Sequence, residues 1–184
     1  MTGIASKSQL RMSFLRYALF TVPAVLMFGT LSGALAGSGY GNPWFDALEK
    51  PAAMPPGAAF GIVWPVLYIL LGLSLAMVLH ARGARGRGLA VGLFVLQLVL
   101  NYAWSPLFFA WHQVGAALWL IAAIIVLTVV TTVLFWGIRR AAALLLIPYL
   151  AWLAFAAFLT AEVGRLNPGA EQLVPGEVSS DIAI

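Results

Sequence analysis

Apolar residues along the chain gather into five long runs, separated by short stretches rich in glycine, proline and charged residues. The runs cover residues 17–37, 58–79, 89–111, 115–138 and 141–163. A helix of about 20 apolar residues crosses a hydrocarbon core about 30 Å thick. Helices satisfy their own backbone hydrogen bonds, which lipid cannot do for them. The pattern therefore predicts an all-α integral membrane protein, a bundle of five transmembrane helices.

The first run raises the alternative of a cleaved signal peptide. Ala34-Leu35-Ala36 matches an Ala-x-Ala cleavage pattern, and a basic segment precedes the run. The apolar region of a signal peptide usually has about 7–15 residues. This run has roughly 20, which is enough to span a bilayer. We therefore expect a retained helix.

Three segments lie outside the transmembrane domain expected over residues 17–164. Residues 1–16 are polar and basic, and we expect a disordered or surface-lying arm. Residues 38–57 form a long connector rich in glycine and proline, in which residues 44–49 can form one or two helical turns. Long connectors of this kind are usually lids, binding loops or disordered. Residues 165–184 are predicted to be a disordered tail.

Composition supports the membrane assignment. Hydrophobic residues make up 62% of the 184 residues and charged residues 9%, against about half and about a quarter in soluble proteins. The net charge of +4 does not indicate nucleic-acid binding, because the basic residues flank the apolar runs instead of forming one stripe. The chain has no cysteine, which excludes disulfides and thiolate metal sites. His80 and His112 are interpreted as interfacial, and no metal site is expected.

The distribution of basic residues predicts an orientation. Eight of the ten fall in the N-terminal arm, in residues 82–87 and in residues 139–140, and an odd number of spans puts these on one side. Lys50 and Arg165 fall on the other side. By the positive-inside rule the N-terminus is cytoplasmic, and the connector and C-terminus lie outside. We expect the cytoplasmic membrane of a bacterium.

Polar and aromatic residues within the runs are the candidate functional residues. Residues 97, 101, 104 and 108 share one helical face by their spacing, and so do residues 60, 64 and 68. The set is Phe60, Trp64, Tyr68, Gln97, Asn101, Trp104, Phe108, Tyr149 and Trp152. Buried amides need partners, so these faces should point into the bundle. Two interpretations stay open: hydrogen bonds between helices, each about 0.6–2 kcal/mol, or a pocket for a flat apolar ligand. Trp44, Trp111 and Trp136 are interpreted as interfacial.

Small residues suggest close helix packing. Gly29, Gly33 and Gly37 share a face that suits packing within the bundle or between two copies, and Gly88 and Gly92 form a second candidate seam. No charged residue lies in the middle of a run, which argues against an ion-driven pump. A Ser/His/Asp set, paired carboxylates and a phosphate-binding loop are also missing from the sequence, which argues against a conventional hydrolase.

Several motifs together resemble the TspO/MBR family (tryptophan-rich sensory protein, translocator protein, peripheral-type benzodiazepine receptor). The connector and second run contribute Trp44-Phe45-Asp46-Ala47-Leu48-Glu49-Lys50-Pro51, Pro55-Pro56, Phe60, Trp64 and Leu67-Tyr68. The third run adds Gln97-Leu98, Asn101, Trp104 and Phe108-Phe109, and the fifth adds Pro148-Tyr149 and Trp152. Arg165-Leu166-Asn167 closes the match, which covers about residues 30–168 in order and spacing.

The resemblance implies a five-helix bundle, often a homodimer, with a pocket beneath a lid made by the first connector. Its ligands are porphyrins such as protoporphyrin IX and haem, and in animals cholesterol and synthetic drugs; no further cofactor is required. Carried over by motif, the pocket residues are Trp64, Tyr68, Asn101, Trp104, Tyr149 and Trp152. The lid residues are Trp44, Phe45, Lys50, Pro51, Pro55, Pro56 and Phe60. Trp64 and Trp152 match tryptophans linked in some members to light-dependent porphyrin breakdown.

The chain departs from the family pattern at several positions. Ala52-Ala53-Met54 stands where an aromatic residue is usual, and Phe45 replaces a tyrosine. Thr160 replaces an asparagine, and Ala161 stands where cholesterol-binding members carry a tyrosine. A cholesterol motif at Arg165 is therefore not supported.

Three functions follow from these observations. The first is a porphyrin-binding membrane protein that senses, sequesters or transports tetrapyrroles. The second is an enzyme that degrades bound porphyrin with light and oxygen, with Trp64 and Trp152 as its reactive residues. The third is a ligand-free scaffold whose aromatic faces only pack helices together.

Overall fold

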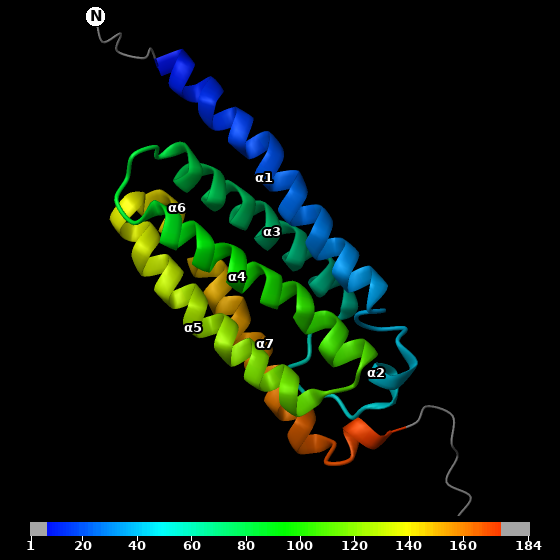
Figure 1. Cartoon of the computed structure of the whole chain (residues 1–184). Coiled ribbons are helices and arrows are strands. Elements are labelled where there is room, and N and C mark those ends of the chain that lie inside the picture. The colour runs from blue at the N-terminus through cyan, green and yellow to red at the C-terminus, as the bar shows by residue number, and fades with distance from the viewer. Residues whose placement is uncertain (1–6, 174–184) are drawn as a thin grey trace, which may run out of the picture.

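The computed structural model describes residues 7–173, which form helices and connecting turns without a strand in that range (Figure 1). In chain order the elements are α1 (Lys7–Leu35), α2 (Pro43–Ala47), α3 (Gly57–His80), α4 (Arg87–Ser105), the π-helix η1 (Pro106–Ala110), α5 (Val114–Ile138), α6 (Arg140–Leu144), α7 (Ile147–Leu166) and the 3₁₀ turn η2 (Ala170–Gln172).

Five helical segments are long and apolar enough to cross a membrane, which confirms the predicted all-α membrane bundle. They are Met12–Leu35, Gly57–His80, Arg87–Ala110, Val114–Ile138 and Arg140–Leu166. Large apolar side chains cover the outside of the bundle: Phe20 is 77% exposed and Trp119 is 79% exposed. Lipid is the solvent that accommodates such a surface.

The helices pack side by side, with α1 against α3, α4 against α5, and α5 against α7 (Figure 1). The rings of Phe94 in α4 and Phe135 in α5 stack with centroids 5.6 Å apart, and both are fully buried. The same core contains Val25 of α1, Leu71 of α3, Ile124 of α5 and Leu146 in the turn between α6 and α7. The core therefore joins all the spanning helices near the end where α6 lies.

The contact between α1 and α3 depends on glycine. A Cβ at Gly72 would lie 2.6 Å from the Cα of Val22, and a Cβ at Gly29 would overlap the ring of Tyr68. The Thr21 hydroxyl donates a 2.8 Å hydrogen bond to the carbonyl of Gly72 across the same seam. Of the two uses expected for the small-residue face of α1, Gly29 serves packing within the bundle.

Both ends of the chain hold more structure than the pattern predicted. Helix α1 begins at Lys7, so most of the arm expected over residues 1–16 is helical, because residues 7–16 contain no glycine or proline to stop the helix. At the other end, α7 continues to Leu166 and η2 follows, with Ala170 buried. The tail expected to be disordered from residue 165 is thus ordered to residue 173; residues 1–6 and 174–184 lie outside the described range.

Two spans are interrupted at prolines. Pro106 opens η1, where the Trp111 amide donates to the Pro106 carbonyl five residues back. Pro148 stands in the first turn of α7, where its missing amide costs no hydrogen bond. The expected fifth helix is accordingly split into α6 and α7. Pro23 and Pro65 lie inside α1 and α3 without ending them.

Candidate ligand-binding site

A cavity of about 830 Å³ lies between α1, α3, α4, η1, α7 and the connector. This volume falls in the range of small-molecule pockets, about 300–1,000 Å³. The lining residues with large side chains are Tyr40, Phe45, Met54, Phe60, Trp64, Tyr68, Trp104, Phe108, Phe109, Trp152 and Leu159. The cavity wall is thus mainly aromatic.

The tryptophans of the wall face one another across segments distant in sequence. Trp64 of α3 and Trp152 of α7 lie with ring centroids 6.4 Å apart at 89°. Phe60 packs edge-on against Trp152 at 5.8 Å. Trp104 stacks on Phe108 at 5.0 Å, nearly parallel. Such faces suit a flat, apolar ligand.

The wall offers few polar groups and no charged one. None of the lining residues is Asp, Glu, Lys, Arg or His. The indole N–H of Trp104 donates to the Ala117 carbonyl at 3.1 Å, so it is already used. The indole N–H of Trp152 is buried and has no hydrogen-bond partner within residues 7–173. This nitrogen exposes less than 1 Å² of surface, so the ring of Trp152 borders the cavity while its N–H does not open onto it.

Five residues of the expected pocket line the cavity: Trp64, Tyr68, Trp104, Phe108 and Trp152.

The three other expected pocket residues, Gln97, Asn101 and Tyr149, are buried outside the cavity wall. The hydroxyl of Tyr68 donates to the Asn101 side-chain oxygen at 3.3 Å, so Asn101 orients a residue of the wall. The hydroxyl of Tyr149 donates to the Gln97 side-chain oxygen at 3.0 Å. These amides join helices, one of the two interpretations that the spacing left open.

Some residues that line the cavity were not predicted from the sequence to belong to a pocket. Gly33, Ala34 and Gly37 of α1 border the cavity, as do Tyr40 and Asn42 of the connector. The pattern marked the glycines only as a packing face. Because glycine has no side chain and Ala34 has only a methyl group, this part of α1 leaves the space that the aromatic residues of the other helices enclose.

The connector is fastened over this end of the bundle by Trp44. Its side chain is only 1% exposed, so the interfacial interpretation of Trp44 is wrong. The indole N–H donates to the Ala170 carbonyl at 2.8 Å, and the ring stacks on His112 at 4.4 Å. His112 has a left-handed backbone (φ 58°), unusual for a residue with a side chain. Trp44 therefore joins α2, the turn before α5 and the C-terminal segment. Trp111 and Trp136 are 66% and 48% exposed, and their interfacial position stays a prediction.

Lys50 holds the connector in shape. Its ammonium donates to the carbonyls of Phe45, Asp46 and Leu48 at 2.7, 3.1 and 3.0 Å, which are the carbonyls at the end of α2. It also lies 4.8 Å from the centre of the Phe45 ring. A cation at a helix C-terminus is favourable.

The prolines shape the rest of the connector. Pro51 is buried, the Pro55 carbonyl accepts from the hydroxyl of Tyr40 at 3.2 Å, and Pro56 precedes the first turn of α3. Of the expected lid residues, Phe45 and Phe60 reach the cavity wall.

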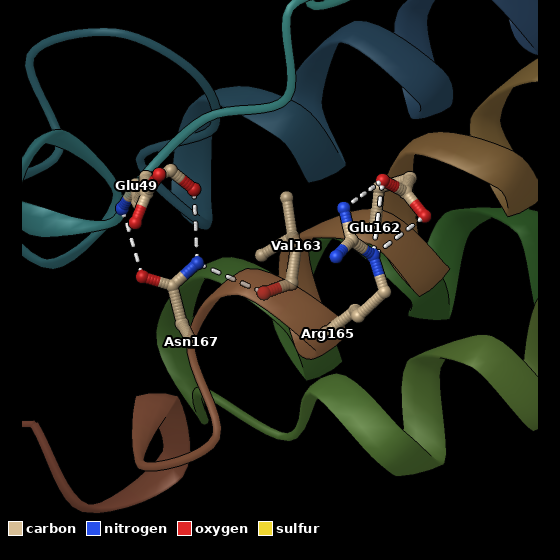
Figure 2. Close-up of polar contacts among 5 residues, drawn as sticks. All are labelled: Glu49, Glu162, Val163, Arg165 and Asn167. Carbon is tan, nitrogen blue, oxygen red and sulfur yellow. Dashed lines mark hydrogen bonds and ion pairs between the residues drawn. The ribbon is translucent and has the colours of Figure 1, made fainter.

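Asn167 ties the connector to the end of α7 (Figure 2). Its side-chain oxygen accepts from the Glu49 amide at 2.8 Å, and its side-chain nitrogen donates to the carbonyls of Glu49 and Val163 at 2.9 and 2.8 Å. The nearby ion pair of Arg165 and Glu162, 2.8 Å long, stays within α7. The side-chain amide of Asn167, and not this ion pair, therefore joins the connector to the end of α7.

Comparison with known proteins agrees with this architecture. The sequence pattern that defines the TspO/MBR family matches residues 20–166. The chain is 33% identical over 127 residues to Protein CrtK of Rhodobacter capsulatus, covering 68% of this chain and 79% of that protein. It is 36% identical over 126 residues to Tryptophan-rich protein TspO of Chlorobaculum tepidum, covering 68% and 80%. It is 38% identical over 143 residues to the human Translocator protein, covering 77% and 85%. A five-helix membrane bundle, tryptophans around a lidded cavity and this similarity together show that the chain belongs to the TspO/MBR family.

Proposed function

We propose that the cavity binds a porphyrin-type tetrapyrrole, held within the membrane for sensing, sequestration or transport. Family membership supports a membrane sensor or translocator role. The ligand is our proposal, and the aromatic wall of the cavity carries it.

The shape and chemistry of the wall support a flat aromatic ligand. Trp64, Trp104 and Trp152 come from three different helices and surround one space. The ring of Trp152 lies 6.4 Å from that of Trp64, centre to centre and nearly perpendicular, so two indoles border one corner of this space. Because no cation lines the wall, the carboxylates of a porphyrin would have to lie at the opening, where water or lipid headgroups solvate them.

The donor set favours a metal-free porphyrin over haem. Haem iron is usually held by histidine, cysteine, methionine or tyrosine. Neither His80 nor His112 lines the cavity, and the chain has no cysteine. Met54 and the two tyrosines of the wall remain, of which the Tyr68 hydroxyl is engaged by Asn101. Protoporphyrin IX, which needs no axial ligand, is therefore the probe of choice.

The test is a titration of the detergent-purified full chain with protoporphyrin IX, followed by porphyrin absorbance. We expect saturable binding that weakens by up to about tenfold in Trp152→Phe, because an aromatic contact contributes about 0.5–1.5 kcal/mol. Trp119→Phe is the matched control, since Trp119 is 79% exposed and does not line the cavity. Absence of saturable binding, or equal loss in both variants, contradicts the proposal and favours a scaffold.

A second candidate, light-dependent oxidation of the bound porphyrin, is favoured by the proximity of Trp64 and Trp152. Both indoles border the cavity with centroids 6.4 Å apart, so a photoexcited ligand would touch two oxidisable rings. Dioxygen is the oxidant that this reaction requires. Illumination in air should produce a new chromophore that Trp64→Phe and Trp152→Phe abolish. Bleaching at the rate of free porphyrin argues against this activity.

We also propose that two copies associate. Gly88 and Gly92 are exposed on α4, and beyond the adjacent backbone of its own helix a Cβ built at either position meets no atom of residues 12–173 within 4 Å. That open surface allows a second helix to approach closely. Light scattering in detergent should give the mass of two chains, and Gly92→Leu should shift it toward one. A single-chain mass for the unmodified protein refutes the association.

For orientation, we propose that the N-terminus faces the cytoplasm of a bacterium and the connector lies outside. The clustering of basic residues at the end opposite the connector supports this by the positive-inside rule. Labelling of single cysteines placed at Ala84 and Ala52 by an impermeant reagent on intact cells tests it. Labelling only at position 52 is expected; labelling only at position 84 reverses the orientation.

A further inference from the structure

The two ends of the bundle differ sharply in charge. The end opposite the connector carries six arginines with described side chains: Arg16, Arg82, Arg85, Arg87, Arg139 and Arg140. The four acidic residues within residues 7–173 belong to the connector, the end of α7 and η2, all at the other end (Figure 1). We call the arginine-rich end the basic end.

Contacts between α1, α3 and α4 bring the first arginines together. The guanidinium of Arg82 donates to the Tyr17 hydroxyl at 3.0 Å, which joins the turn after α3 to α1 beside Arg16. The guanidinium of Arg87 donates to the Leu79 carbonyl at 2.9 Å, which holds the start of α4 against the end of α3. The partners in both contacts are uncharged.

Helix packing brings the remaining arginines to the same level. Phe94 stacks on Phe135, and these rings lie seven residues after Arg87 and four residues before Arg139. At 1.5 Å per helical residue, both arginines lie beyond the stack at the same end. The hydroxyl of Ser74 donates to the Ala142 carbonyl at 2.8 Å, which seats α6 on α3. Arg140, the first residue of α6, therefore lies at the basic end as well.

The arginines of the basic end lack a negative partner in the described part of the chain. Among the described side chains, those of residues 12–173, the only ion pair is that of Glu162 and Arg165, at the other end. Arg139 and Arg140 are exposed, and no side-chain hydrogen bond joins them to residues 12–173. The Arg140 guanidinium lies 5.6 Å from the centre of the half-exposed Trp136 ring. Because exposed tryptophans concentrate at the membrane interface, this contact places both arginines at headgroup depth.

We propose that the basic end binds the headgroups of anionic phospholipids in the adjoining leaflet, with Arg139 and Arg140 as the principal contacts. A guanidinium matches the geometry of a phosphate diester and can donate two hydrogen bonds to it. A lipid with net negative charge complements a surface that has no carboxylate of its own. A zwitterionic lipid presents the same phosphate beside its own cation and should bind more weakly. The surface is separate from the cavity, which lies under the connector at the other end.

The test is native mass spectrometry of the full chain in detergent, titrated with phosphatidylglycerol or phosphatidylcholine of the same acyl chains. Each basic residue near an anionic surface strengthens association about fivefold at moderate salt. We therefore expect phosphatidylglycerol to bind about tenfold or more tightly than phosphatidylcholine. The preference should fall about tenfold in Arg139→Gln/Arg140→Gln, persist in Arg139→Lys/Arg140→Lys, and shrink as ionic strength rises.

Arg165→Gln is the matched control, because it removes a cation from the other end and should leave the preference unchanged. Helical circular dichroism checks that each variant is folded. Unchanged preference in Arg139→Gln/Arg140→Gln, or an equal loss in Arg165→Gln, overturns the proposal. In that case the arginines serve only to set the orientation of the chain.

Discussion

The ring of Tyr68 lies directly against the backbone of Gly29, where even one added methyl group would overlap it. Tyr68 borders the ligand cavity and donates its hydroxyl to Asn101. The contact therefore couples the packing of α1 on α3 to the shape of the cavity.

Gly29→Ala should destabilise the protein by about 1–3 kcal/mol, because the new methyl must displace either the ring or the helix. Thermal unfolding in detergent, followed by circular dichroism, measures this. Gly33→Ala is the control, since the nearest atom to its Cβ would be the Ser38 hydroxyl oxygen at 3.8 Å. That variant should be neutral or slightly more stable, as alanine is favoured over glycine in helices. Equal effects of the two substitutions would refute the contact.

Gly72→Ala should destabilise the protein more than Gly29→Ala, because the new Cβ would overlap the backbone of α1. The Cα of Val22 lies 2.6 Å from that position, and a main chain cannot rotate away as a side chain can. We expect α1 to separate from α3 and the melting temperature to fall. Gly137→Ala, at an exposed helical position with no atom of residues 7–173 within 4 Å, should leave it unchanged. If Gly72→Ala and Gly137→Ala have the same melting temperature, the contact between α1 and α3 accommodates a methyl group that its geometry indicates it should not.

Asn167→Ala should loosen the connector, because two hydrogen bonds between the end of α7 and Glu49 depend on that side chain, and a third to Val163 holds it in place. At about 0.5–1.5 kcal/mol for each net bond, the Glu49 amide should exchange with solvent at least tenfold faster. Hydrogen exchange with mass spectrometry measures the rate. Arg165→Gln breaks only an exposed ion pair, with the Arg165 side chain 66% exposed, and should have little effect on that rate. Equal exchange in Asn167→Ala and the unmodified protein would show that the lid is held elsewhere.

Tyr149→Phe separates helix packing from ligand binding. The variant loses the 3.0 Å hydrogen bond to Gln97, and stability should fall by about 1 kcal/mol. Porphyrin affinity should not change, because neither residue borders the cavity. Trp152→Phe should have the opposite effect: the porphyrin affinity should fall, and the stability of the protein should change little. Parallel losses in both variants would mean that the buried amides and the cavity form one unit.

The spacing of residues along a helix predicts which of them share a face, but not how deep that face lies. Gln97 and Trp104 are seven residues apart, and both turn inward as expected. Gln97 is fully buried between α4, α5 and α7, whereas Trp104 reaches the cavity. The difference arises from where the neighbouring helices diverge, and that is a property of the whole bundle.

The contacts of the connector are a second feature that spacing along the sequence does not predict. The family resemblance implied that the connector, with Lys50 and Pro51, forms a lid, yet the residues that this connector contacts could not be predicted from the sequence. Trp44 bonds to Ala170, 126 positions away, and stacks on His112. A tryptophan near the end of a helix is usually interfacial, which is why sequence reasoning misplaced this one.

The amino-acid sequence was sufficient to predict the membrane environment, the number of spans and the charge difference between the two ends. These follow from long apolar runs and from the positions of charged residues, which depend on local composition alone. The packing of the helices was needed to identify the aromatic residues that enclose the cavity, the glycine against which Tyr68 packs and the asparagine that holds the connector. Those features arise from contacts between residues far apart in the chain, and such contacts exist only once the helices have packed.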